Sequence, residues 1–432
     1  MNNNKTFWTS ETQLYYDRIC ISSASGCYLY DVNKNKYLDA NSGTWNVFLG
    51  HGISAIGDCI SAQQHKLDYV SNHRFIHEQG SRLSERLISL FPQKTFSSIY
   101  FTSGGAEAVD TSLKMAKQYW YNKGCKSKNR VISLYESYHG STIGAVGVSG
   151  DPWDRIPFDP IINDSVHFYP QYCFLCRLGL KSSQCNMVCL SDLEYKIKFY
   201  GEENISALIM EPIMGVGGVI IPDKEYMSRI RELCNKYDIL LIFDEVTSGI
   251  GRCGEYFSCI KYGIYPDMLL FGKAISNGSQ PLGGVIVSEK VMNAFVSPDM
   301  QIQFRHGFTN SGHPVACASG NCVLDIFERD NIIELCRKKS ECFSTILNRL
   351  KTYPFIGEIR IIGLMIAIEL INPKDGTPLV ISGLDIIFRN KGLLLSQMTQ
   401  VICLMPPVIM TEEEFDKVVS IIAETIGEYV EN

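Results

Sequence analysis

The sequence predicts an α/β protein whose largest part is a doubly wound, mainly parallel β-sheet. Strand-like and helix-like segments alternate, the strand-like segments are short continuous apolar runs, and each run ends at a polar or glycine residue. Parallel strands have this pattern because helices bury both faces of their sheet. Ligands bind to such sheets beyond the carboxyl ends of the strands, so we expect the functional site there.

The elements are expected in the following order. Residues 22–40 predict a hairpin of two alternating strands around the polar turn DVNKNK. The central part predicts strands at 98–102, 131–135, 207–210, 239–243 and 268–271, and helices at 106–122 and 224–237. The last part predicts a long helix at 314–328, strands within 358–369, and a terminal helix that begins near Thr411, where Thr411 and Glu414 have the spacing of a capping box.

These elements predict a large central domain and a smaller α+β domain built from both chain ends. We expect residues 1–60 to form the N-terminal segment of the small domain, residues 61–313 the large domain, and residues 314–432 the C-terminal part of the small domain. A chain of 432 residues is long enough for this organisation.

The composition is that of a globular protein and excludes several function classes. Hydrophobic residues make up 45% of the chain and charged residues 20%. The net charge, 40 − 46 = −6, argues against a general nucleic-acid surface. No apolar stretch predicts a membrane-spanning helix, and the opening MNNNKTFWTS lacks the apolar core of a signal peptide. With 16 cysteines expected to be mostly reduced, we predict a cytoplasmic protein with neither nucleic acid nor membrane as a partner.

Three features with chemical potential fall at predicted strand ends. Residues 103–108 (SGGAEA) join a strand to a helix, and the free N–H groups of a helix N-terminus suit a phosphate. The apolar run ILLIF delivers Asp244, which either caps a helix or faces a cation, such as a metal ion or a protonated ring nitrogen. Lys273 follows another buried strand, where desolvation would make its amine nucleophilic.

Two enzyme classes could use these parts. A nucleoside-triphosphatase would use the acidic strand to hold Mg²⁺, but it also needs the loop G-x-x-x-x-G-K-[ST], which this sequence lacks. A pyridoxal phosphate enzyme needs a phosphate site, an aspartate for the pyridinium nitrogen and a lysine that forms a Schiff base. All three are present, in a workable order.

Longer stretches make this assignment specific. FTSGGAEAVDTSLKMA, SYHGST, IMEPIMGVGG, LLIFDEVTSGIGRCG, PDMLLFGKAIS with PLGG, and HGFTNSGHPVACA follow one another between residues 101 and 319. With them, the chain resembles the class III, omega-type aminotransferases of the fold-type I pyridoxal phosphate enzymes, and SGTWNVFLGHG and LMPPVIMTEEE near the two ends fit as well. The resemblance implies pyridoxal 5'-phosphate as cofactor. It also implies ping-pong transfer of an amino group between an amine or amino acid and a keto acid or aldehyde.

The resemblance implies roles for individual residues around the cofactor. Lys273 looks like the Schiff-base lysine that also moves the proton, and Asp244 like the partner of the pyridine nitrogen. Val246 would pack on one face of the cofactor ring and Tyr138 on the other. The carbanion that forms in the reaction would then be stabilised by the protonated ring.

Further residues resemble the phosphate and substrate contacts of the family. Gly105 and Ala106 would give backbone N–H groups to the phosphate, with Ala106 standing where many relatives have a hydroxyl residue. Thr309 resembles a threonine that reaches the phosphate of the neighbouring subunit, which implies a homodimer with shared sites. Glu211 matches an active-site glutamate near cofactor and substrate, and His139 is expected to give structural support rather than act as a base.

One departure from the family concerns the substrate. Many class III enzymes hold an α-carboxylate with an arginine shortly before the PP motif, but here the corresponding residue is Ser396. We therefore expect a substrate amine or aldehyde distant from any carboxylate, or a carboxylate held elsewhere, with Arg74 as the candidate. Arg74 could equally be a surface residue. Trp45 matches an aromatic position of the substrate pocket, with core packing as the alternative.

Two clusters of potential metal ligands occur in the sequence. Four cysteines in the segment 169–190 have spacings that resemble a zinc knuckle, with free thiols or a disulfide as alternatives: Cys173, Cys176, Cys185 and Cys189. His73 and His77 share i, i+4 spacing, but the sequence shows no third ligand, so we expect no metal site there.

Two other functions remain open at this point. A racemase or epimerase of the same fold would use Lys273 and the same ring without the keto-acid half-reaction. A non-catalytic pyridoxal phosphate-binding relative is the alternative from another class, and the intact Lys273, Asp244 and phosphate site argue against it.

Overall fold

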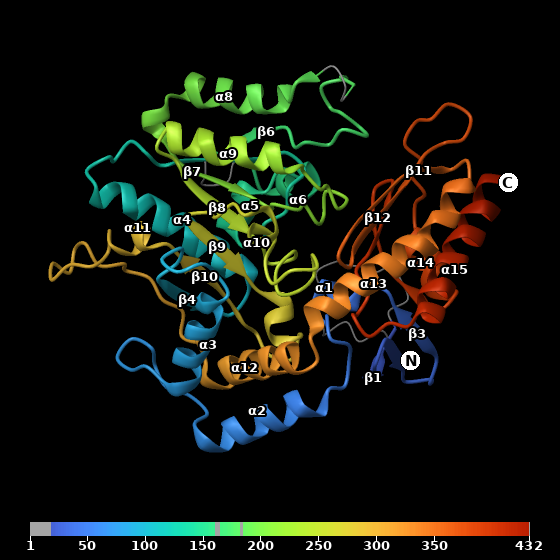
Figure 1. Ribbon diagram of the computed structural model, residues 1–432, viewed down its shortest axis with the longest axis horizontal. Helices are drawn as coiled ribbons and strands as arrows, with labels where there is room; N and C mark the ends of the chain where they lie inside the picture. The colour runs from blue at the N-terminus through green and yellow to red at the C-terminus, as the bar shows by residue number, and fades with distance from the viewer. Residues whose placement is uncertain (1–18, 160–164, 182–184, 432) are drawn as a thin grey trace.

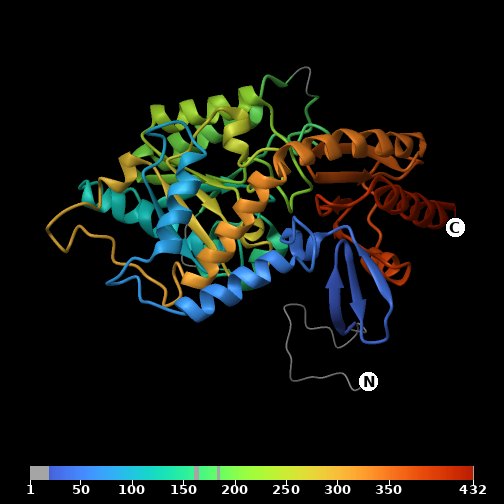
Figure 2. The same ribbon diagram turned by 60° about the horizontal axis from the view of Figure 1, so that its bottom comes forward.

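The structure is a computed structural model that describes residues 19–159, 165–181 and 185–431. The opening MNNNKTFWTS and the first part of the expected domain 1–60 lie outside the described residues. Figures 1 and 2 show a large α/β unit with a smaller unit at one side. The smaller unit contains both the blue start and the red end of the described chain, as the sequence predicts.

A seven-stranded sheet with the order β4-β10-β9-β8-β7-β5-β6 forms the centre of the large unit. Its strands in that order are Ser98–Thr102, Gly283–Val287, Met268–Phe271, Leu240–Asp244, Ile205–Met210, Arg130–Leu134 and Val166–Phe168. Neighbouring strands are parallel except at β10, which is antiparallel to both β4 and β9. The mainly parallel, doubly wound sheet is confirmed, and β6 and β10 are additional strands that the apolar pattern did not predict.

Helices cover both faces of this sheet, which explains the continuous apolar runs. In β8, Leu240 and Ile242 pack in the cluster that contains α4, whereas Leu241 and Phe243 pack in the cluster that contains α8 and α9. The helices and helical turns of the large unit are α3 (Glu78–Ser89), α4 (Gly105–Asn122), α5 (Ile143–Val148), α6 (Pro152–Arg155), η1 (Ile156–Phe158), α8 (Val188–Tyr200), η2 (Glu202–Asn204), α9 (Lys224–Lys236), α10 (Ser258–Tyr262), η3 (Lys273–Ser276) and α11 (Glu289–Met292).

The smaller unit contains two four-stranded sheets, β1-β2-β3-β13 and β11-β12-β15-β14. Its strands are β1 (Ile21–Ser25), β2 (Tyr28–Asp31), β3 (Lys36–Asp39), β11 (Ile356–Ile362), β12 (Met365–Leu370), β13 (Leu393–Leu394), β14 (Ser396–Met398) and β15 (Val401–Leu404). Its helical elements are α13 (Ile332–Leu347), η4 (Asn348–Thr352), α14 (Leu384–Asn390) and α15 (Glu412–Glu431). Leu393 pairs with Leu38, so the two chain ends share one sheet.

The structure contains both local features that the sequence predicts, the capping box at Thr411 and the polar turn DVNKNK. The expected capping box of α15 is confirmed, since Glu414 N donates to Thr411 Oγ1 at 3.1 Å and Thr411 N donates to the Glu414 carboxylate at 2.9 Å. The polar turn DVNKNK does join two strands, with Asp31 Oδ1 accepting from two backbone N–H groups of the turn. The expected two-stranded hairpin has a third strand, β1, which adds to its edge.

Two helices that are far apart in the sequence lie side by side along the large unit (Figures 1 and 2): α2 (Ser54–Lys66) and α12 (Pro314–Arg329). α12 also packs against α3 and against η3, the turn that begins at Lys273. A boundary at residue 314 assigns α12 to the small domain, although most of its packing partners belong to the large one. None of the helices in the described ranges has the length and apolarity needed to cross a membrane.

Candidate active site

Asp244 ends the buried strand β8 and lies at the carboxyl edge of the large sheet. Its side chain is buried, its Oδ2 is 2.8 Å from His139 Nδ1, and its Oδ1 accepts from the backbone N–H of Val246 at 3.1 Å. Because the Asp244 carboxylate accepts hydrogen bonds, His139 donates from Nδ1, so Nε2 carries no proton in the neutral ring. His139 therefore orients Asp244, which agrees with the structural role expected for it.

Lys273 follows the neighbouring strand β9 and is held close to Asp244 by strand pairing, since Asp244 pairs with Leu270. Its Nζ donates to Thr247 Oγ1 at 2.7 Å and lies 4.9 Å from the centre of the Trp45 ring. Burial lowers the pKa of Lys273 to about 8. The φ angle of Lys273 is 46°, a left-handed conformation that costs about 1 kcal/mol in a residue other than glycine.

The N-terminus of α4 lies beside these two residues and forms a cradle of close backbone contacts. A Cβ atom on Gly105 would lie 2.7 Å from Val246 Cγ1, and a Cβ on Gly140 would lie 2.6 Å from the Ala106 Cβ. Glycine is therefore required at both positions for steric reasons. The first turn of α4 leaves the N–H groups of Gly105 and Ala106 without partners inside the helix, so they are available to an anion.

Glu211 and Tyr138 form the next wall of the site. Glu211 Oε1 accepts from the Tyr138 N–H at 3.1 Å, and Oε2 accepts from the Gly215 N–H at 2.9 Å. The Glu211 residue is only 4% exposed, and burial raises the pKa of its carboxyl to about 7. The Tyr138 hydroxyl is 3.1 Å from Ser141 Oγ, which helps to fix the ring.

Trp45 and Ser396 meet at one shared acceptor. Asn41 Oδ1 accepts from Trp45 Nε1 at 2.7 Å and from Ser396 Oγ at 2.8 Å. A Cβ on Gly215 would lie 2.8 Å from the Trp45 ring and 3.4 Å from Glu211 Oε2, so this glycine separates the indole from the carboxylate. The structure thus brings Trp45 and Ser396 together with Lys273 and Glu211, although their positions in the sequence are far apart.

Two expected site residues lie on surface loops of the chain. Arg74 is exposed, and its backbone N–H donates to Ser71 O. Thr309 is also exposed, and its carbonyl accepts from the Tyr69 hydroxyl at 2.9 Å. Neither contact connects these residues with Lys273, so their proposed roles toward substrate and phosphate remain predictions.

The structure shows the surroundings of both candidate metal clusters, the four cysteines and the His73–His77 pair. The four cysteines of the segment 169–190 line a single cavity of about 210 Å³. In the part of the chain that the structure describes, no three Cys, His, Asp or Glu side chains are arranged to hold a metal ion. Both ring nitrogens of His77 are used: Nδ1 accepts from Gly80 N and so caps α3, and Nε2 donates to Gly312 O at 2.7 Å.

Sequence patterns did not identify three contacts of the site. Thr247, which accepts from Lys273, lies three residues after Asp244 and could have been found from that proximity. Asn41 has no such signal, since it joins residues separated by about 350 positions. No sequence signal identifies Arg252 either. Its buried guanidinium donates from Nη1 to Pro406 O and stacks on Phe48.

The described residues fit pyridoxal phosphate. The helix N-terminus with its glycines suits the phosphate, the buried Asp244 suits a protonated ring nitrogen, and Lys273 is a desolvated amine next to both. Tyr138 and Val246 are both partly exposed, and Val246 lies against Gly105 at the start of α4. The geometry thus joins in one place the three groups that such an enzyme needs.

Comparisons with known proteins agree with this geometry. A family model described as aminotransferase class III matches residues 10–426. The chain is 32% identical over 414 residues to the omega-aminotransferase of Caulobacter vibrioides, covering 94% of this chain and 93% of that protein. It is 35% identical over 424 residues to gamma aminobutyrate transaminase 2 of Solanum lycopersicum, covering 94% and 91%.

Solved structures point the same way. An amine transaminase from an uncultivated Pseudomonas species, in its pyridoxal phosphate-bound form, has a TM-score of 0.91 and 32% identity, with 98% of both chains covered. This chain belongs to the class III aminotransferase family.

Proposed function

We propose that this pyridoxal phosphate-dependent aminotransferase works through Lys273, Asp244 and the N-terminus of α4. The observation that carries the proposal is the convergence of a desolvated amine, a buried carboxylate and free helix N–H groups at one sheet edge. The curated relatives are transaminases, so amino-group transfer is favoured over racemisation and over a non-catalytic role.

Pyridoxal phosphate, when bound, supplies an aldehyde that condenses with amines and a ring that accepts an electron pair. Lys273 would hold the aldehyde as a Schiff base and move the proton that leaves the carbon next to the substrate nitrogen. Asp244, oriented by His139, would keep the ring nitrogen protonated, while Val246 and Tyr138 hold the two ring faces.

Borohydride reduction tests the assignment of Lys273. The purified protein should be yellow, reduction should bleach it irreversibly, and peptide mapping should place the pyridoxyl group on Lys273. Lys273→Ala should lose this labelling but still bind the cofactor weakly, because the phosphate and ring contacts remain. A pyridoxyl group on another lysine would refute the assignment.

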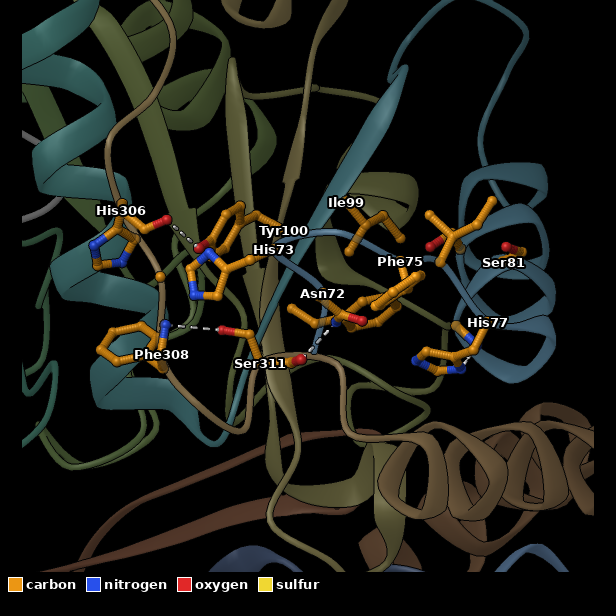
Figure 3. A pocket seen from close by; sticks show the side chains of 15 residues that line it. Asn72, His73, Phe75, His77, Ser81, Ile99, Tyr100, His306, Phe308 and Ser311 are labelled. Carbon is orange, nitrogen blue, oxygen red and sulfur yellow. Dashed lines mark hydrogen bonds between the residues drawn. The ribbon is translucent and has the colours of Figure 1, made fainter. Parts of the chain in front are cut away.

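We also propose a homodimer in which Thr309 completes the partner's phosphate site. Thr309 lies on the loop between α11 and α12, which projects from the large unit in Figures 1 and 2. Beside this loop is a surface pocket of about 320 Å³, which Figure 3 shows between the loop that carries Asn72–His77 and the loop that carries His306–Ser311. Phe75 is 59% and Ile76 90% exposed there, which supports coverage by a second chain.

We further propose that the enzyme works in the cytoplasm and that its small domain is built from both chain ends, with α2 and α12 packed on the large one. Cysteines buried in the core, such as Cys234, Cys259 and Cys403, carry free thiols, which supports a reducing compartment. The pairing of β13 with β3 supports a small domain made from both chain ends.

A further inference from the structure

The amine of Lys273 is held by one hydroxyl group, that of Thr247. Lys273 Nζ donates to Thr247 Oγ1 at 2.7 Å, and within the described part of the chain no second hydrogen bond holds this amine. The rest of the lysine side chain is a flexible stem of methylene groups, so this bond decides where the nitrogen lies. Nζ is the atom to which the proposed function assigns the proton transfer. Thr247 therefore touches the atom on which the reaction depends.

Charged groups face this amine as well, but each of them is bonded elsewhere. Burial is the main cause of the lowered pKa of Lys273, and Glu211 and Asp244 oppose that effect while Arg252 adds to it. The Glu211 carboxylate accepts from two backbone N–H groups, and the Asp244 carboxylate from one histidine and one backbone N–H. The Arg252 guanidinium donates to a backbone carbonyl. The neutral hydroxyl of Thr247 is thus the group that makes the contact.

Thr247 itself is fixed by the turn that follows β8. Gly249 N donates to Glu245 O at 2.9 Å, which closes this turn around Thr247. The side chain is β-branched and has few rotamers, and its methyl group lies so near Gly215 that a Cβ there would be 3.3 Å from it. Threonine hydroxyls in turns commonly bond to the nearby backbone, but this one is bonded across to Lys273 at the start of η3. The turn therefore presents the hydroxyl to the amine.

We propose that Thr247 is a positioning residue for the proton transfer assigned to Lys273, because its hydroxyl holds the free amine in place and leaves the nitrogen lone pair open. A neutral amine that donates one N–H to Oγ1 keeps its lone pair, and a proton that arrives there bonds to that pair and makes an ammonium. The ammonium donates to the same oxygen in a charge-assisted hydrogen bond, which is about twice as strong as a neutral one. The hydroxyl thus orients the amine and stabilises its protonated form. The inference rests on the proposed aminotransferase function.

The first test measures the Lys273 amine directly and needs no turnover. In the full-length protein loaded with pyridoxamine 5'-phosphate, the cofactor carries its own amine, so Lys273 is free. The rate of its acetylation by acetic anhydride is followed against pH by mass spectrometry of the Lys273 peptide. In Thr247→Val, which nearly keeps the size and removes the hydroxyl, the ammonium loses an acceptor, so the pKa of the amine should fall below that of the wild type. Thr247→Ser keeps the acceptor and should keep the wild-type profile.

The second test measures the proton transfer in the holoprotein. Loss of the cofactor absorbance is followed with the more reactive of alanine and butylamine, with hydrogen or deuterium on the reacting carbon. In Thr247→Val we expect the rate constant to fall at least about tenfold, because the amine loses its fixed position and its charge-assisted bond. The deuterium isotope effect should be at least that of the wild type, and cofactor affinity should change less than about threefold. Thr247→Ser should recover most of the rate constant.

Thr425→Val is the matched control, because it makes the same substitution at a buried threonine of α15 in the small unit. It should change neither the acetylation profile nor the rate constant. An unchanged profile or an unchanged rate constant in Thr247→Val overturns the inference, as does an equal loss in Thr247→Ser or in Thr425→Val. A wild-type holoprotein whose cofactor absorbance changes with neither amine disproves the proposed aminotransferase roles, whereas the acetylation profile still decides whether Thr247 holds the Lys273 amine.

Discussion

Single residues set the charges of this site, and Asp244 is the clearest case. In Asp244→Asn the neutral amide can no longer favour a protonated ring nitrogen, so we expect kcat to fall about 10²–10³-fold, or about 3–4 kcal/mol. Cofactor affinity should change much less, since the phosphate contacts remain. Steady-state kinetics and cofactor titration of the purified variant measure both.

The matched control for that variant is Asp267→Asn at the other end of the same sheet. Asp267 is also buried, and it accepts from Arg231 at 2.9 Å and from the Leu241 N–H at 2.8 Å. Its loss should lower the free energy of unfolding while kcat stays near that of the wild type. Near-normal kcat in Asp244→Asn would contradict the role given to Asp244.

Glu211 predicts a pH dependence of stability. Its pKa is raised from the ordinary value of 4.5 to about 7 by burial, so the folded state holds this proton more tightly than the unfolded chain. Its contribution to stability is fully present below pH 4.5, is lost as pH rises towards 7, and then stays lost. Glu211→Gln removes this loss, so its stability relative to wild type should improve by about 2 kcal/mol between pH 5.5 and 8.5. Denaturant unfolding at both pH values measures it, and a pH-independent difference would rule out the raised pKa.

At the scale of elements, the site depends on how closely the start of α4 approaches Val246. A Cβ on Gly105 would lie 2.7 Å from Val246 Cγ1, so Gly105→Ala must push the helix N-terminus or Val246 out of place. We expect weaker cofactor binding, by at least about tenfold, because the N–H groups and the ring contact shift together. Gly104→Ala is the control, since a Cβ there meets nothing within 4 Å and the backbone is extended. Equal cofactor affinities in the two variants would show that the close approach does not position the phosphate site.

At the scale of the whole molecule, shared sites predict complementation between two inactive variants. Lys273→Ala lacks the amine, and Thr309→Glu should repel the phosphate of the partner's site. Each should be inactive alone. Dimers that combine one chain of each kind contain one intact site of two, so a random mixture after co-expression should recover about a quarter of wild-type activity. If mixed dimers, isolated by two affinity tags, are inactive, Thr309 does not complete the partner's site.

Residues that follow their own strand could be predicted from the sequence, whereas residues joined across the fold could not. Asp244 and Lys273 each follow a short apolar run, and the ends of neighbouring parallel strands meet at one edge. The capping box of Thr411 and Glu414 spans four residues and is equally local. Strand β10 escaped prediction, because its sequence GGVIV begins with two glycines, which are poor strand formers.

By itself, the sequence determined the mainly parallel sheet, because apolar runs express local preferences of the chain. Its resemblance to the class III aminotransferases determined the family and the cofactor. Only the tertiary structure decided how Ser396 and Trp45 share Asn41, how Arg360 is committed to Glu358 and Glu369, and how Glu211 is buried against the backbone N–H groups of Tyr138 and Gly215. Hydrogen-bond partners and burial depend on which distant segments pack together. The substrate wall of this enzyme is therefore a property of the packed fold, since no local stretch of the chain contains both sides of it.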